Sequence, residues 1–305
     1  MRIVTYKELE NKDEVLPILS LSFGGSPNPR QMEGMIKVDP RTHNGPVGFC
    51  ALENDRVIGF VGIMEIPTKN ISGDTEVVGG IWGVSTHPGN ARRGISTALM
   101  GAAHEYFTEK GYRFSFLVTR KTFIAYAFYR HLAYEDALQF PSAFKFLMKK
   151  RKAAAKGDAR IRWKSVMNLY SDFTSPRTGF VVRDIGFFKS LPRFASLDQG
   201  RAERVIVREE GYVFFGMTGG ALTVDEVVPS NEDETKNLVT IIESRAKDVV
   251  SDRCVLNHNL LETYRSRGYV TQMESHGLLM VKPLTKATFD EVYGRRFYAT
   301  SFDLF

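Results

Sequence analysis

Residues 83–100 read GVSTHPGNARRGISTALM in one-letter code, and an apolar run over residues 76–85 leads into them. Pro88 together with Gly89 and Gly94 predicts a loop. From Ile95 to Phe107 apolar residues recur at helical spacing, and Gly111 can end that helix. The sequence therefore predicts a strand, a glycine-containing loop and a helix in direct succession.

The loop before this helix has the chemistry of an anion-binding site. The first amides of a helix have no partner within it, and the helix dipole adds partial positive charge there. Arg92 and Arg93 add full charges, while Ser96 and Thr97 can donate hydroxyl hydrogen bonds. The stretch has neither the Gly-Lys-Ser/Thr ending of a nucleoside-triphosphate loop nor the glycine spacing of a dinucleotide fingerprint. The alternative is a connection that carries glycines and surface arginines and binds no ligand.

Strands and helices alternate on both sides of this loop. In the first half we expect a strand over 1–10, a helix between Asn11 and Phe23, a hairpin of 47–52 with 57–64, the strand and helix described above, a strand over 114–119 and a short helix over 122–131. In the second half we expect strands over 204–208, 212–217 and 221–228, a helix over 232–247, a strand over 254–256 and a short helix over 260–267. Both halves thus follow one order: hairpin, strand, helix, strand and short helix.

A polar, basic and alanine-rich segment separates the two halves. We expect a first domain over 1–148, a basic linker over 149–162 and a second domain over 163–305. A local echo supports duplication, because YRHLAY at 129–134 and YRSRGY at 264–269 fall at the same place in the order of elements. The predicted fold class is α/β, with the mixed sheet of an α+β fold, built as two tandem copies of one domain.

Composition and charge limit the classes to which this protein can belong. The 305 residues are 43% hydrophobic and 25% charged, and no apolar run is long enough to span a bilayer. The N-terminus lacks the apolar core of a secretory signal, so we expect a cytoplasmic protein without a membrane partner. Two cysteines far apart predict neither a disulfide framework nor a metal site. Much of the net charge of +6 lies around the linker, which we interpret as a solvated segment rather than as a nucleic-acid-binding surface. A homo-oligomer remains possible.

The stretch from Gly83 to Met100 resembles motif A of the GNAT acyltransferases, in which Gln/Arg-x-x-Gly-x-Gly/Ala opens a helix after a strand and a proline. Gly94 matches the first glycine and Ser96 the second small position, whereas Ala91 stands where the family prefers glutamine or arginine. Residues 128–134 (FYRHLAY) resemble a second signature of the family, aromatic-Tyr-x-x-hydrophobic-Gly-aromatic. The tandem arrangement resembles that of the enhanced-intracellular-survival type.

The resemblance implies transfer of an acetyl group from acetyl-CoA, as co-substrate and without a metal, to the primary amine of a small molecule or peptide. The backbone of Trp82, Gly83 and Val84 would bind the pantetheine and polarise the thioester. Tyr129 would protonate the departing thiolate. The residues that would hold the pyrophosphate are Arg92, Arg93, Gly94, Ile95, Ser96 and Thr97.

The general base stays open between several residues. Glu65 and Glu76 lie in expected strands from which either could face the amine. His87 stands where the loop begins, and we expect it near the phosphate or as a cap of the strand rather than near the amine. Tandem GNAT proteins are known to place a C-terminal carboxylate in the active site. The apolar ending of this chain fits a terminus that docks on the protein, which makes Phe305 a second catalytic candidate beside Tyr129.

The matching loop of the second half has the opposite character. It contains no glycine, and Glu232, Asp233 and Glu234 occupy the first turn of the expected helix. These carboxylates would neutralise the helix dipole and repel a phosphate. We therefore expect a degenerate second copy that does not bind CoA and instead completes the substrate cleft or holds the domain pair together.

Two other functions stay open beside N-acetyl transfer. The first is a CoA-binding regulator that binds a partner without catalysis, and the departure at Ala91 keeps it open. The second is an aminoacyl-tRNA-dependent transferase, because such enzymes also use tandem GNAT domains and the basic linker could meet RNA.

Overall fold

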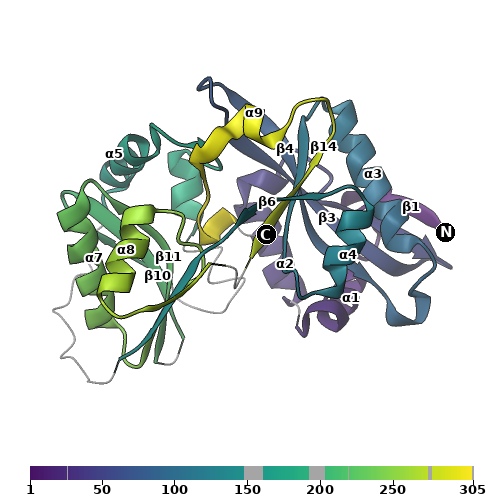
Figure 1. Ribbon diagram of the computed structural model, residues 1–305. Coiled ribbons are helices and arrows are strands. Elements are labelled where there is room, and N and C mark those ends of the chain that lie inside the picture. The colour runs from purple at the N-terminus through teal and green to yellow at the C-terminus, as the bar shows by residue number, and fades with distance from the viewer. Residues whose placement is uncertain (26, 148–160, 192–202, 219, 274–276, 304–305) are drawn as a thin grey trace.

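The computed structural model describes residues 1–25, 27–147, 161–191, 203–218, 220–273 and 277–303. Its strands form two mixed sheets that lie side by side, and helices cover both (Figure 1). The predicted fold class is therefore confirmed. No helix within the described ranges combines the length and the apolar character that a membrane crossing requires.

The first half contains the predicted hairpin, central strand and central helix, and it adds elements that the sequence pattern did not reveal. Its strands are β1 (Arg2–Thr5), β2 (Gly48–Glu53), β3 (Arg56–Lys69), β4 (Thr75–Thr86), β5 (Phe114–Thr119), β6 (Glu135–Gln139) and β7 (Ser142–Phe146). Its helices are α1 (Val15–Phe23), α2 (Pro29–Val38), α3 (Ile95–Glu109) and α4 (Ile124–His131). The strand predicted over 1–10 is wrong beyond Thr5, where a short 3-10 helix follows.

The second half repeats the hairpin, strand and helix. Its strands are β8 (Thr178–Gly179), β9 (Glu203–Val207), β10 (Gly211–Thr218), β11 (Ala221–Pro229), β12 (Val249–Asp252), β13 (Val270–Gln272), β14 (Leu278–Pro283) and β15 (Phe297–Tyr298). Its helices include α5 (Trp163–Thr174), α7 (Glu232–Arg245), α8 (His258–Ser266) and α9 (Phe289–Tyr293). The strand predicted over 254–256 is wrong, because β12 has already ended at Asp252 and Val255 instead packs into the core as irregular backbone.

The two halves exchange strands. The first sheet has the order β1-β2-β3-β4-β5-β14-β6, and the second has the order β13-β7-β12-β11-β10-β9. Strand β14, from the end of the chain, thus lies between β5 and β6, and β7 lies between β12 and β13 (Figure 1). Strand pairing crosses the predicted boundary at residue 148 in both directions, and most of the predicted linker lies outside the described residues.

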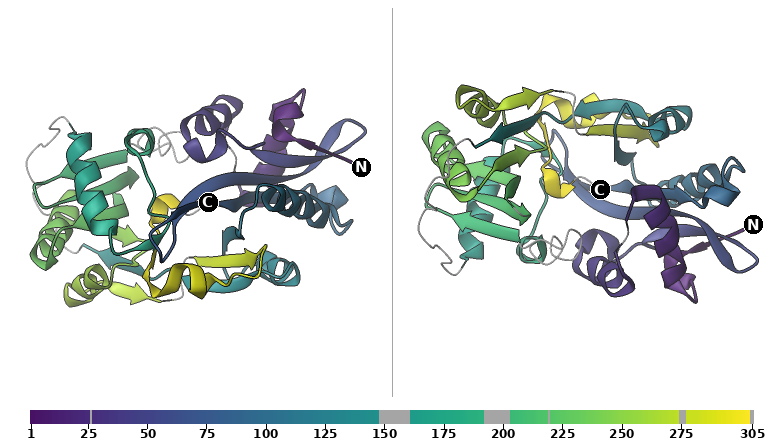
Figure 2. Two further views of the ribbon diagram at one scale, coloured as in Figure 1. Left: turned by 90° about the horizontal axis from the view of Figure 1, so that it is seen from above. Right: turned by 90° about the horizontal axis from the view of Figure 1, so that it is seen from below.

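Local sequence explains the central layers of the first domain. Asn54 and Asp55 adopt positive φ angles of 50° and 56°, which suits the tight turn between β2 and β3. Helix α3 covers one face of the sheet through buried residues such as Leu99 and Phe107. Helices α1 and α2 cover the opposite face, so that the sheet forms a middle layer (Figure 2).

The end of the chain lies between the two domains. Strand β15 pairs with β8, and β8 in turn pairs with the end of β3 at Lys69. A short 3-10 helix, Ser301–Asp303, follows, where Asp303 accepts a hydrogen bond from the buried Arg183 at 2.8 Å. This segment therefore packs against both halves of the molecule.

Candidate active site

Strand β4 diverges from strand β5 at the point where the predicted cofactor site begins. Within the described strands, β4 pairs with β5 only over Gly79–Ile81, although both strands continue further. The pairing of β4 with β3 also shifts register, which places a bulge at Gly83 and Val84 with a φ of +61° at Gly83. The backbone after Ile81 therefore has no β5 partner and is available to a ligand that lies between the two strands.

Helix α3 presents an uncapped N-terminus beside this opening. Gly94, the N-cap residue, has a φ of +74°, and neither a capping side chain nor an acidic residue stands in the first turn of this fully described helix. The amides of Ile95, Ser96 and Thr97 lie in that turn, where no intrahelical acceptor exists. The hydroxyl groups of Thr86 and Ser96 form a hydrogen bond of 2.7 Å, which connects the end of β4 to the start of α3.

The two predicted arginines have different environments. Arg93 forms two hydrogen bonds to the carboxylate of Glu53, at 2.5 and 3.0 Å, and Asn90 donates to the same carboxylate at 3.3 Å. Arg92 is exposed at a φ of +61° and forms no ion pair with any described residue. Arg93 therefore anchors the loop to the β2–β3 hairpin, whereas Arg92 is free to approach a phosphate.

Tyr129 is buried on α4. Its ring packs edge-on against that of Tyr134, with the ring centroids 6.0 Å apart. Burial raises the pKa of Tyr129 to about 12. Its hydroxyl has no hydrogen-bond partner in the described part of the chain, so it is a protonated donor that still has its proton to give at neutral pH.

The side chains considered as bases already have partners. Glu76 accepts two hydrogen bonds from Arg113, at 2.6 and 2.7 Å, and Glu65 accepts one from the hydroxyl of Tyr106 at 2.8 Å. His87 accepts the amide of Gly89 through Nδ1 at 3.2 Å. Phe305 lies outside the described residues, so its catalytic role stays a prediction.

A cavity that the sequence did not reveal adjoins the bulge of β4. It has a volume of about 330 Å³ and is bounded by α1, α2, Trp82 and Gly83. Helix α2 contributes Met32 and Met35, which sequence reasoning missed. The signal was present, because Asn28 and Gln31 form a capping box around a proline at the first position of α2.

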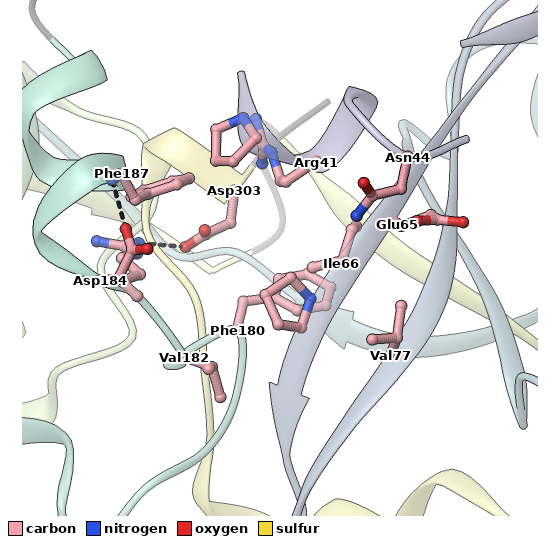
Figure 3. A pocket seen from close by; sticks show the side chains of 13 residues that line it. Arg41, Asn44, Glu65, Ile66, Val77, Phe180, Val182, Asp184, Phe187 and Asp303 are labelled. Atoms are coloured by element: carbon pink, nitrogen blue, oxygen red, sulfur yellow. Dashed lines mark hydrogen bonds and ion pairs between the residues drawn. The ribbon is translucent and has the colours of Figure 1, made fainter. Parts of the chain in front are cut away.

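A second cavity, of about 290 Å³, lies at the junction of the domains (Figure 3). Arg41 and Asp303 line it, and Arg183 donates a hydrogen bond to Asp303 there. Glu65 lines the same cavity. Arg41 also lines the cavity beside β4, so the two hollows share a wall.

The second domain repeats the strand geometry, but its corresponding helix begins with a side-chain cap and acidic residues. Strand β11 runs on to Pro229 after its pairing with β12 ends at Val224, as β4 runs on past β5. The side chain of Asn231 caps α7 by accepting the amide of Glu234 at 2.8 Å. The first turn of α7 also contains Glu232, Asp233 and Glu234. An anion at this end of α7 would meet three carboxylates instead of unpaired amides.

Comparison with solved structures identifies the fold. A GCN5-related N-acetyltransferase from Kribbella flavida is 21% identical, with a TM-score of 0.68 over 93% of this chain and 72% of that one. Eis1 from Mycobacterium abscessus is 16% identical, with a TM-score of 0.62 over 93% and 73%. A tandem GNAT protein from the clavulanic acid pathway is 13% identical, with a TM-score of 0.58 over 94% and 98%. The chain therefore has a tandem GNAT fold.

The sequence itself identifies the first domain. Residues 4–137 match the model of the acetyltransferase (GNAT) domain family. The first half of this chain is thus a GNAT domain, as its loop and second signature indicated. No curated protein matches the sequence significantly.

Proposed function

We propose that this protein transfers an acetyl group from acetyl-CoA to a primary amine. The observation that carries the proposal is the uncapped start of α3 beside the divergence of β4 from β5. The amides of Ile95, Ser96 and Thr97 are oriented for a pyrophosphate, and Arg92 adds a free charge. Among the described residues, no group of His, Cys, Asp or Glu is arranged to bind a metal, and the proposed reaction does not use one.

The chain can supply the proton that the leaving group needs. The amine nitrogen forms a bond to the thioester carbonyl carbon, the carbon–sulfur bond breaks, and the thiolate takes a proton. Tyr129 is a protonated donor without a partner among the described residues, and it lies on the helix that follows β5. The amine loses its proton to water or to a carboxylate.

Two measurements test this function. Calorimetry should detect binding of acetyl-CoA to the protein, and release of free thiol with a panel of primary amines should report turnover. We expect Tyr129→Phe to lower kcat by roughly 10²-fold or more, the scale of one acid–base contribution, and to leave the dissociation constant of acetyl-CoA unchanged. Failure of acetyl-CoA to bind the unaltered protein would exclude the proposed activity.

A CoA-binding regulator without catalysis is the second candidate. It is favoured by the partners of Glu65 and Glu76, since each carboxylate already accepts hydrogen bonds from a neighbouring side chain. Binding of acetyl-CoA with no thiol release for any amine in the panel would support the regulator over the enzyme.

A further inference from the structure

The cavity beside the bulge of β4 has the composition of a site for an apolar amine. Among the described residues that line it, all but two are uncharged, and those two pair with each other. The uncharged side chains of this wall include Leu19, Phe23, Met32, Met35, Ile36, Thr42, Met64 and Trp82. Flexible methionines beside aromatic rings adapt to flat apolar ligands.

The two charged residues of this wall neutralise each other. Arg41 Nε lies 2.9 Å and 3.1 Å from the two carboxylate oxygens of Asp39, and Arg41 Nη2 lies 2.7 Å from Oδ2. Both side chains are buried. Burial alone would raise the pKa of Asp39, but the Arg41 guanidinium lowers it, so the carboxylate stays charged. Arg41 Nη1 donates to the carbonyl oxygen of Phe302 at 3.2 Å. Because its guanidinium pairs with Asp39, neither side chain offers a ligand an unpaired charge.

The position of this cavity matches that of an acceptor. Its wall includes the backbone at Gly83, the bulge at which the proposed donor site begins. Residues of α1 and α2 line it, and these helices cover one face of the sheet. Helix α3 covers the other face (Figure 2). An amine in the cavity would therefore approach β4 from the side opposite α3.

We propose that the acceptor is a monoamine whose single amino group is carried on an apolar body of arylalkyl size. The inference deepens the proposed function and rests on it. A volume of about 330 Å³ is at the small end of ligand sites, which run from roughly 300 to 1,000 Å³. A polyamine would have to bury a second ammonium against methionine and aromatic side chains, and no described residue of the wall offers it an unpaired counter-charge, so the cost is several kcal/mol.

The test compares phenethylamine with spermidine as acceptors at saturating acetyl-CoA. We expect kcat/KM for phenethylamine to exceed that for spermidine by at least about 100-fold, which corresponds to the lower part of that burial cost. Calorimetry of phenethylamine with the CoA-saturated protein gives a readout that does not depend on turnover. Spermidine acetylated as well as phenethylamine would overturn the inference and leave the proposed function intact. Phenethylamine that neither binds nor reacts would also overturn it, whereas no binding of acetyl-CoA would overturn the proposed function itself.

A charge placed in the wall adds a second test. Met35 is half-buried, so Met35→Glu can fold with its carboxylate at the cavity. We expect this variant to lose at least about tenfold in kcat/KM for phenethylamine and to gain relative activity on spermidine, with binding of acetyl-CoA unchanged. Met273→Glu is the matched control, because Met273 is exposed in the second half of the chain. Equal acceptor preference in both variants would show that this cavity does not select the amine.

Discussion

Gly94 offers a clean test of the phosphate site, because asparagine and aspartate differ there by one charge and little in shape. The residue has a φ of +74°, and a Cβ at this position would meet no atom within 4 Å. Asparagine and aspartate tolerate left-handed backbone better than other side chains, so both substitutions should leave the loop folded. Any difference in CoA affinity between Gly94→Asn and Gly94→Asp then reports electrostatics.

The expected size follows from the exposure of the site. Two unit charges about 4 Å apart interact by about 1 kcal/mol in water and by about 4 kcal/mol at a protein surface of lower effective dielectric. Gly94 is exposed, which favours the lower part of that interval. We expect a penalty of about 1–2 kcal/mol, so the aspartate variant should bind acetyl-CoA roughly 5- to 30-fold more weakly than the asparagine variant.

Isothermal calorimetry with acetyl-CoA at low and at high salt measures this difference. Screening should shrink the ratio between the two variants as the ionic strength rises from about 0.05 to 0.5 M. Circular dichroism and thermal unfolding of both variants give the folding control. Equal dissociation constants at low salt would refute the placement of the pyrophosphate at the start of α3.

Two further predictions concern stability. A Cβ on Gly79 would lie 2.4 Å from the ring of Phe107, so Gly79→Ala should lower the free energy of unfolding in urea by about 1–3 kcal/mol. Gly101 lies on an exposed part of helix α3, and a Cβ there would meet no atom within 4 Å. Gly101→Ala should therefore stabilise the folded protein by roughly 0.5–1 kcal/mol. Equal effects of the two substitutions would contradict the packing argument. Burial, with a contribution from Asp225, raises the pKa of Asp252 to about 7, so the folded state holds its proton between roughly pH 4 and pH 7 while the unfolded chain does not. The stability of the unaltered protein relative to Asp252→Asn should therefore fall as the pH rises from about 5 to 8, and urea unfolding that shows a constant difference would reject this ionisation.

The sequence predicted those parts of the fold that are local in the chain. The strand, loop and helix around Gly94 could be predicted because glycine, proline and a helical apolar period act within a few residues. The exchange of β7 and β14 could not be, since an alternating pattern indicates a strand and not its partner. The error over 254–256 has the same origin, because a short apolar run can be a strand or buried irregular backbone.

One side of the candidate site could be predicted from the sequence and the other could not. Its donor side depends on backbone amides and on Gly94, which a motif can reveal. Its acceptor side joins Met32 and Met35 of α2 to Trp82 of β4, and only the assembled sheet brings these side chains to one cavity. The pairing of Arg93 with Glu53 was equally out of reach, because Glu53 lies at the end of the hairpin strand β2.

The strand exchange has a consequence for the synthesis of this protein on the ribosome. The edge of β5 ends at Thr119, but its partner β14 begins only at Leu278. At about 5–20 residues per second, roughly 8–30 s separate the emergence of the two strands. During that interval the nascent first domain presents an open sheet edge, and β6 has no strand beside it. Because an unpaired edge is a template for aggregation, the yield of folded protein should depend on how long this edge stays open.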